Sequence, residues 1–290
     1  MVSSSPPGPG HTVGRRLPDR PTQCAIAGLT TAVAVATAAG LGWIGADHAR
    51  LFTASHEAPS VAHWLGTDTL GRDVASRAMR GAQLSIFTGV AAALGSVAIG
   101  TSLGVIAGLR GGWVDRSLIT LSQTIGAIPP LILMLGLGVM LHASIASAAF
   151  AIAVSQWVGV FRTTRAEAQR LAQSDFIRAA QAMGASPFDI LRTHVGPTLA
   201  PLWTTTLALH FVYAVKAEAV LGYLGLGSTA LPSWGRMLGE GAGGLGNGIW
   251  WPVLAAATPL AALVLCAQHI ADRKASIGTT PQRRAPARQS

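Results

Sequence analysis

The stretch SDFIRAAQAMGASPFDILRTHVGPTLAP, residues 174–201, is a polar, charged segment in an otherwise strongly apolar chain. Its spacing predicts two short helices joined at a glycine. Phe176, Ala180 and Met183 fall on one face of the first helix. Gly184 stands where helices commonly end with a left-handed residue. The stretch therefore predicts a helical elbow, a compact surface suited to docking, and we call residues 174–201 the elbow.

The second helix of the elbow has its own start signal. Ser186 is expected to be its N-cap and Pro187 its first residue, and Asp189 stands where a capping box places its acidic partner. Pro197 and Pro201 are expected to end the polar helical region before the next apolar run.

The composition indicates a membrane protein. Of 290 residues, 50% are hydrophobic and only 11% are charged, whereas soluble domains carry about 25% charged residues. Several uncharged runs reach the roughly 20 residues that a helix needs to cross a bilayer. We therefore predict an all-α membrane protein with about six transmembrane helices. The formal charge of +9 comes from arginines that flank apolar runs, which is typical of membrane topology and not of a nucleic-acid surface.

The apolar runs predict an order of segments along the chain. We expect a disordered cytoplasmic tail, a first transmembrane helix, an extracytoplasmic segment, a permease-like core and a second cytoplasmic tail, at residues 1–23, 24–46, 47–83, 84–271 and 272–290. Within the core, residues 162–201 form a polar loop that contains the elbow. Lys and Arg gather in the tails, around Arg110 and in this loop, so the positive-inside rule places the elbow and both termini in the cytoplasm.

Two patterns in the core suggest how the spans pack. Gly100, Gly104 and Gly108 repeat every four residues, and such small-residue stripes permit close helix approach in lipid; a substrate groove is the second interpretation. Pro129-Pro130 should kink the third span. The long uncharged run that contains this pair should divide into two spans near residues 142–147, and residues 110–116 are expected to be a short basic loop.

A few polar side chains are candidates for function. Lys216 and Glu218 fall near the end of a predicted span and are candidate gating or interfacial residues. Asp68, Arg72 and Asp73 belong to the same candidate set, and Asp73 is expected to pair with Arg77 at i, i+4.

No cofactor or metal is expected. The external residues His48, His56 and His63 match no known metal-ligand spacing and are interpreted as loop residues. Cys24 and Cys266 fall in predicted spans and are interpreted as packing residues. The chain also contains no GxxxxGK[ST] loop, so we expect no ATP hydrolysis by this chain.

Three stretches carry a resemblance to a known family. Ala179, Ala180, Gly184 and Pro197 match the cytoplasmic EAA loop of ABC-importer permeases, while Arg178 replaces its acidic residue. Residues 65–73 resemble the LGTDxxGRD signature that precedes the second span in C-type permeases of the dipeptide/oligopeptide/nickel class. Residues 218–227 and 232–235 are similar to the E-A-x-L-x-F-L-G-L-G and PSWG stretches of that class.

The resemblance implies a type I ABC-importer permease fold in a bacterial plasma membrane. It implies half of a heterodimeric pore for dipeptides or oligopeptides, with a second permease subunit, two ATP-binding cassette ATPases and an extracytoplasmic substrate-binding protein as partners. It also implies that the elbow receives the motion of the ATPase. The residues expected to carry this coupling are Phe176, Arg178, Ala179, Ala180, Met183, Gly184, Phe188 and Pro197.

Three alternatives remain at this stage. A nickel-chelate importer would belong to the same family. A proton-coupled secondary transporter would use Lys216 and Glu218, although it would need further intramembrane acids. A membrane scaffold would use the elbow only to recruit a soluble partner.

Overall fold

The computed structural model describes residues 20–45, 49–51, 55–142, 144–228 and 231–278. These residues form helices joined by turns and loops, which confirms the predicted all-α fold. The helices are α1 (Arg20–Gly40), α2 (Val74–Arg110), α3 (Gly112–Gly126), α4 (Pro130–Met140), α5 (Ile145–Ala172), α6 (Asp175–Ala182), α7 (Pro187–Ile190), α8 (Gly196–Tyr223), α9 (Trp234–Ala242) and α10 (Trp251–Gly278).

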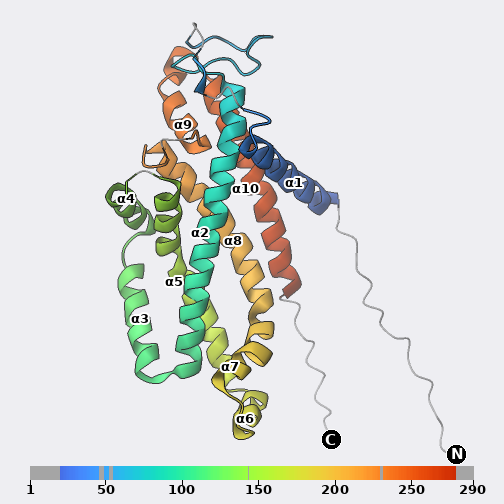
Figure 1. The fold of residues 1–290 in the computed structure, drawn as a ribbon, viewed down its shortest axis with the longest axis vertical. Helices are drawn as coiled ribbons and strands as arrows, with labels where there is room; N and C mark the ends of the chain where they lie inside the picture. The colour runs from blue at the N-terminus through green and yellow to red at the C-terminus, as the bar shows by residue number, and fades with distance from the viewer. Residues whose placement is uncertain (1–19, 46–48, 52–54, 143, 229–230, 279–290) are drawn as a thin grey trace, which may run out of the picture.

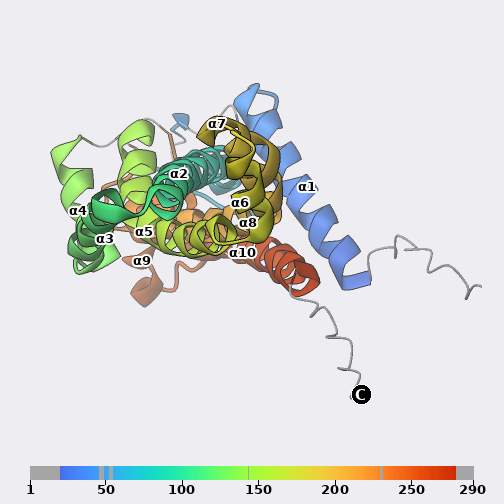
Figure 2. The ribbon, with the colours of Figure 1, turned by 90° about the horizontal axis from the view of Figure 1, so that it is seen from below.

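Five of the described helices are long and apolar enough to cross a membrane, and α3 with α4 adds a sixth span if the bent pair counts as one. The protein is therefore a multi-pass membrane protein. In Figure 1, α2, α5 and α8 run along the long axis of the molecule, α3 and α4 lie on one side, and α1 and α10 lie on the other. The elbow helices α6 and α7 lie at one end of this bundle, as Figure 2 also shows, and α9 lies at the opposite end.

The predicted glycine stripe holds α2 tightly against α5. A Cβ atom on Gly100 would lie 2.5 Å from Val160 Cβ, and one on Gly104 would lie 2.9 Å from the Phe161 carbonyl oxygen. A Cβ on Gly108 would likewise lie 2.6 Å from Ala168 Cβ. These distances leave no space for a side chain, so the glycines set the separation of the two helix backbones. Packing, the favoured interpretation of the stripe, is confirmed.

The prolines break the third span as predicted. The axes of α3 and α4 differ by 85°, and Pro129 and Pro130 stand at the N-cap and first residue of α4. The expected division between the third and fourth spans also appears, because α5 starts with a capping box between Ser144 and Ser147. However, only Gly111 separates α2 from α3, so the predicted loop over residues 110–116 is wrong.

Candidate functional site

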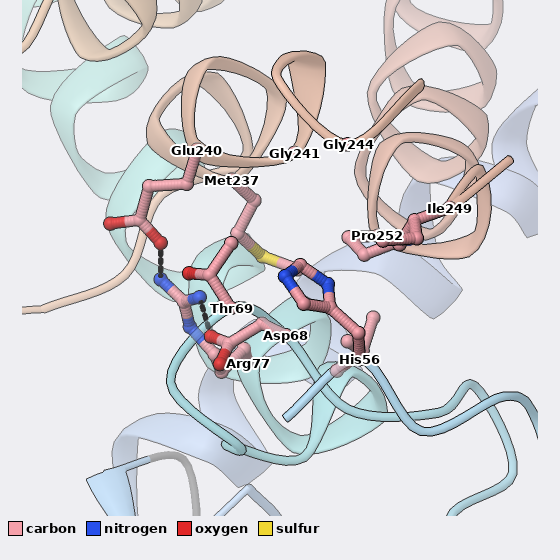
Figure 3. A pocket seen from close by; sticks show the side chains of 11 residues that line it. His56, Asp68, Thr69, Arg77, Met237, Glu240, Gly241, Gly244, Ile249 and Pro252 are labelled. Atoms are coloured by element: carbon pink, nitrogen blue, oxygen red, sulfur yellow. Dashed lines mark hydrogen bonds and ion pairs between the residues drawn. The ribbon is translucent and has the colours of Figure 1, made fainter. Parts of the chain in front are cut away.

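The end of the bundle that carries α9 holds a cluster of ion pairs. We call it the external cluster, because the positive-inside rule predicts that this end lies outside the cytoplasm. Its members are Asp68, Arg72, Arg77, Arg236 and Glu240. Arg77 lies between two carboxylates, and its Nη2 is 2.7 Å from Glu240 Oε2 while its Nη1 contacts Asp68 Oδ2 (Figure 3). Arg72 joins the same two acids, at 2.7 Å from Asp68 and 2.9 Å from Glu240. The cluster therefore fastens the segment before α2 to α9.

Glycine turns and backbone bonds position the acid at its centre. Gly66 and Gly71 have φ values of 69° and 72°, a region that L side chains rarely adopt. The turn between them brings the backbone N–H groups of Leu70 and Arg72 to Asp68 Oδ1, each at 2.9 Å. The sequence stretch that resembles the family signature is therefore a turn that presents one carboxylate to two arginines.

The expected pair between Asp73 and Arg77 is wrong. Asp73 instead caps α2, because its Oδ2 accepts the backbone N–H of Ser76 at 2.7 Å. Its Oδ1 lies 3.2 Å from His63 Nδ1. Arg77 points away from Asp73 toward α9, where Glu240 compensates its charge.

The members of the cluster are charged, and they are buried or half-buried. Asp68 and Arg77 are each only 3% exposed. Burial alone would raise the pKa of Asp68, but the backbone N–H groups of Arg72 and Leu70 and the charges of Arg77 and Arg72 hold it below its usual value. Burial would also raise the pKa of Glu240, but the charges of Arg77 and Arg72 and the hydrogen bonds from Arg77 and Arg236 hold it below its usual value. Both carboxylates are therefore ionised near neutral pH.

The cavity beside the cluster is too small for a substrate. It measures about 10 Å³ and is lined by His56, Asp68, Arg77 and Glu240 together with apolar residues (Figure 3). That volume is about the minimum for one water molecule. The cluster therefore serves as a fastening between segments.

Glu218 lies in the same region but faces away from Lys216. The Ser85 hydroxyl of α2 donates to Glu218 Oε2 at 2.8 Å, and Glu218 is 2% exposed. The next residue of α8, Ala219, contacts the start of α9 so closely that a Cβ on Gly235 would lie 2.2 Å from the Ala219 carbonyl oxygen. Residues 218–227 and 232–235, which together resemble one pattern of the family, thus pack directly on one another. Lys216 is exposed on another face of α8.

The elbow occupies the opposite end of the bundle. Its inner side is apolar: Ile177 and Ala180 of α6 and Ile190 at the end of α7 are buried against Leu171 of α5 and Val105 of α2. This core attaches the elbow to the two helices that the glycine stripe holds together. Ile177 was not among the expected residues, although its spacing from Ala180 is that of one helix face.

The predicted glycine joint and the predicted start of the second helix are confirmed. Gly184 has a φ of 86°, and the Ser186 hydroxyl accepts the backbone N–H of Asp189 at 3.2 Å. The expected end at Pro197 and Pro201 is wrong, because a π-helical turn over Leu191–Val195 leads directly into α8, which includes both prolines.

Most of the expected coupling residues face outward. Phe176 is 49% exposed and Met183 82% exposed, and Arg178, Ala179, Gly184 and Pro197 are also exposed. Ala180 is buried in the elbow core. The side chain of Phe188 lies outside the described residues. Phe176 is held in place by an edge contact with the His194 ring, with centroids 5.9 Å apart.

The structure adds two residues to the candidate set that the sequence did not suggest. Arg236 and Glu240 both belong to α9. A signal was present, because Ser233 precedes the helix as an N-cap and the two charged residues are spaced for an i, i+4 pair, which the structure shows at 2.8 Å.

Comparison with known proteins gives a consistent result. Residues 100–276 match the family model described as "Binding-protein-dependent transport system inner membrane component". The chain is 36% identical to the oligopeptide transport system permease protein OppC of Bacillus subtilis (strain 168), over 63% of this chain and 60% of that protein. It is 34% identical to the dipeptide transport system permease protein DppC of the same organism, over 67% and 61%.

A third relative is the glutathione transport system permease protein GsiD of Pectobacterium atrosepticum, which is 33% identical over 64% of this chain and 62% of that protein. The alignments thus span only about three fifths of the length of these relatives. Among solved structures, a chain of the MetNI methionine ABC transporter in an inward-facing conformation superposes with a TM-score of 0.55 and 20% identity, covering 70% of this chain and 96% of that chain. This likeness confirms the predicted permease fold.

Proposed function

Because the chain belongs to the family of binding-protein-dependent transport system inner membrane components, we propose that it is the membrane-spanning subunit of an ATP-driven peptide importer. It forms half of the translocation pore, beside a second permease subunit. An extracytoplasmic binding protein delivers the peptide, and two ATPase subunits supply the energy. The names of its relatives support peptides as the substrate class.

The observation that carries this proposal is the construction of the elbow. Its inner face is fixed to α2 and α5 by a buried apolar core, whereas Phe176 and Met183 present apolar side chains outward. Exposed apolar side chains at the end of a membrane protein mark an interaction site. A partner that binds them and moves would displace the two spans to which the elbow is attached. We therefore place the ATPase on the elbow and the elbow in the cytoplasm.

The arrangement around Glu218 disfavours proton coupling. The carboxyl group is enclosed by α2 and the start of α9, and it does not face Lys216, so the pair offers no continuous route for a proton. A scaffold would bind a partner through the elbow without moving a solute.

Deletion of residues 178–192 from the assembled importer tests the proposal. We expect ATP-dependent uptake of peptide into proteoliposomes to disappear, while membrane insertion and assembly with the second permease subunit persist. Leu265→Ala, a truncation at an exposed apolar position on α10, serves as the control and should leave uptake intact. Uptake that survives the deletion, or that stops on collapse of a proton gradient with ATP still present, would contradict the proposal.

A further inference from the structure

A hollow of about 320 Å³ lies at the break between α3 and α4. It is bounded by the end of α3, the residues of the break, one face of α5 and one face of α8. Its polar lining consists of Ser155, Gln156, Arg162, His210 and Tyr213, and its other lining residues are Ile125, Gly126, Ile128, Pro130, Val158 and Gly159. The lining contains basic and hydrogen-bonding side chains and no acid.

The fold leaves space for the Arg162 side chain of α5, but no acid of the described residues neutralises its charge. A Cβ on Gly126 would lie 3.1 Å from Arg162 Nη2, so α3 ends with a glycine where the guanidinium needs space. The next turn of α5 shows the contrast, because Arg165 Nε lies 2.5 Å from Asp115 Oδ1. Among the described residues, no acid forms an ion pair with Arg162.

A second cation, Lys216 of α8, does not line the hollow but contacts Tyr213, which does. His210, Tyr213 and Lys216 are spaced by three residues and follow one face of this helix. The His210 and Tyr213 rings are 6.2 Å apart, and Lys216 Nζ lies 4.8 Å from the centre of the Tyr213 ring. Ser96 of α2 fixes the other side of this group, with its Oγ 3.3 Å from His210 Nδ1. Tyr213 is 52% exposed, so the group is open to a ligand.

Two cations in membrane-spanning helices are costly unless an anion or water compensates them. Arg162 and Lys216 are exposed in the chain by itself, whereas the buried Arg77 is paired with two carboxylates. The break adds to the positive potential, because α4 begins here and Pro129 provides no side-chain cap for its first N–H groups. Because Arg162 lines the hollow and no acid does, the hollow favours an anionic group that comes from outside the described chain.

We propose that this hollow binds the carboxylate of the peptide during its passage through the pore. The guanidinium of Arg162 and the ammonium of Lys216 attract the carboxylate, and Gln156, His210 and Tyr213 hydrogen-bond the peptide. The volume falls in the range of about 300–1,000 Å³ that is typical of small-ligand sites. This site rests on the proposed function, since it assigns the carboxylate recognition of the proposed peptide pathway to residues of this chain.

Binding to the purified importer, assembled without its soluble binding protein, tests this site directly. The probes are labelled alanyl-leucine and its C-terminal amide, which lacks the carboxylate. We expect the acid to bind at least about tenfold more tightly than the amide, as charge-assisted hydrogen bonds would give. Arg162→Gln and Lys216→Gln should each reduce acid binding toward the level of the amide, and Arg162→Lys should retain most of the preference. Arg116→Gln, at an exposed cation of α3, is the matched control and should change neither.

The outcomes separate this inference from the proposed function. Equal binding of acid and amide to the wild-type importer would overturn the inference, and so would a preference that both glutamine variants retain. Failure of the proposed function would appear separately, as absence of ATP-dependent uptake of alanyl-leucine by the complete wild-type importer. Melting temperatures of the variants close to wild type would establish that any lost binding is not caused by unfolding.

Discussion

The two ends of the bundle differ in the kind of side chains they carry and in the exposure of those side chains. At the external cluster, opposite charges are compensated within the chain, and Arg77 and Arg72 each contact both Asp68 and Glu240. At the elbow, apolar side chains such as Phe176 and Met183 remain exposed. The charges of the first end are compensated within the chain, whereas the exposed apolar side chains of the second end would be covered only by a partner. Loss of a cluster residue should therefore cost stability, and loss of an outward elbow residue should cost coupling.

The largest effect on stability is expected from Arg77→Leu. It removes the more buried of the two arginines that contact both Asp68 and Glu240. Loss of one partner of a buried ion pair costs about 3–5 kcal/mol. Thermal unfolding of the purified protein in detergent measures the loss. The matched control is Arg170→Leu, because Arg170 is 67% exposed in its pair with Glu167 and surface pairs contribute only about 0–1 kcal/mol. Equal destabilisation by both variants would remove the distinction between the two ends.

A smaller effect is expected from acid. The folded protein holds the pKa values of Asp68 and Glu240 below their usual 3.8 and 4.5. Their contribution to stability is therefore complete above these usual values and is lost as the pH falls through the lowered, folded-state values. The melting temperature should decline over this acidic range. The decline should be shallower in Arg77→Leu, which lacks one of the two arginines that both carboxylates share. An identical decline would argue against the cluster as its source.

The smallest effect on stability is expected from the double variant Phe176→Ala and Met183→Ala. Both side chains are largely outside the elbow core, so unfolding should change by no more than about 0.5 kcal/mol. Binding of the ATPase subunits and ATP-dependent uptake should nevertheless fall strongly, because the exposed apolar surface is removed. The control Leu265→Ala removes a similarly exposed side chain from α10 and should affect neither. A large loss of stability in the double variant would show that the elbow also relies on these residues for its fold.

Local features of the fold could be predicted from the sequence because each depends on residues at or near one position in the chain. Gly184 follows from the need for a left-handed residue, and the break at Pro129 follows from the missing N–H group. The end of α4 and the start of α5 coincide with the predicted division near residues 142–147. In each case a single residue type at one position determines the backbone.

The ion pairs of Glu240 with Arg72 and Arg77 in the external cluster could not be predicted from the sequence, because they join residues that lie far apart in the chain. Asp73 and Arg77 have the spacing of a helical pair, but Asp73 caps α2 and Arg77 reaches a helix far away in the chain. The path of α8 through Pro201 was also missed, because a proline inside a membrane helix is tolerated when neighbouring groups satisfy the freed carbonyl. Long-range partners of this kind depend on tertiary packing, which spacing in a sequence does not record.

The glycine stripe has a mechanical consequence. With 37 residues and a rise of about 1.5 Å per residue, α2 is roughly 55 Å long and extends from the external cluster to the elbow core. The three glycines bring its backbone against α5 without intervening side chains, so the two helices have little play relative to each other. A displacement imposed on the elbow should consequently reach the opposite membrane face as motion of one stiff rod. Spin labels placed at the two ends of α2 would keep a constant separation during the transport cycle if this is correct.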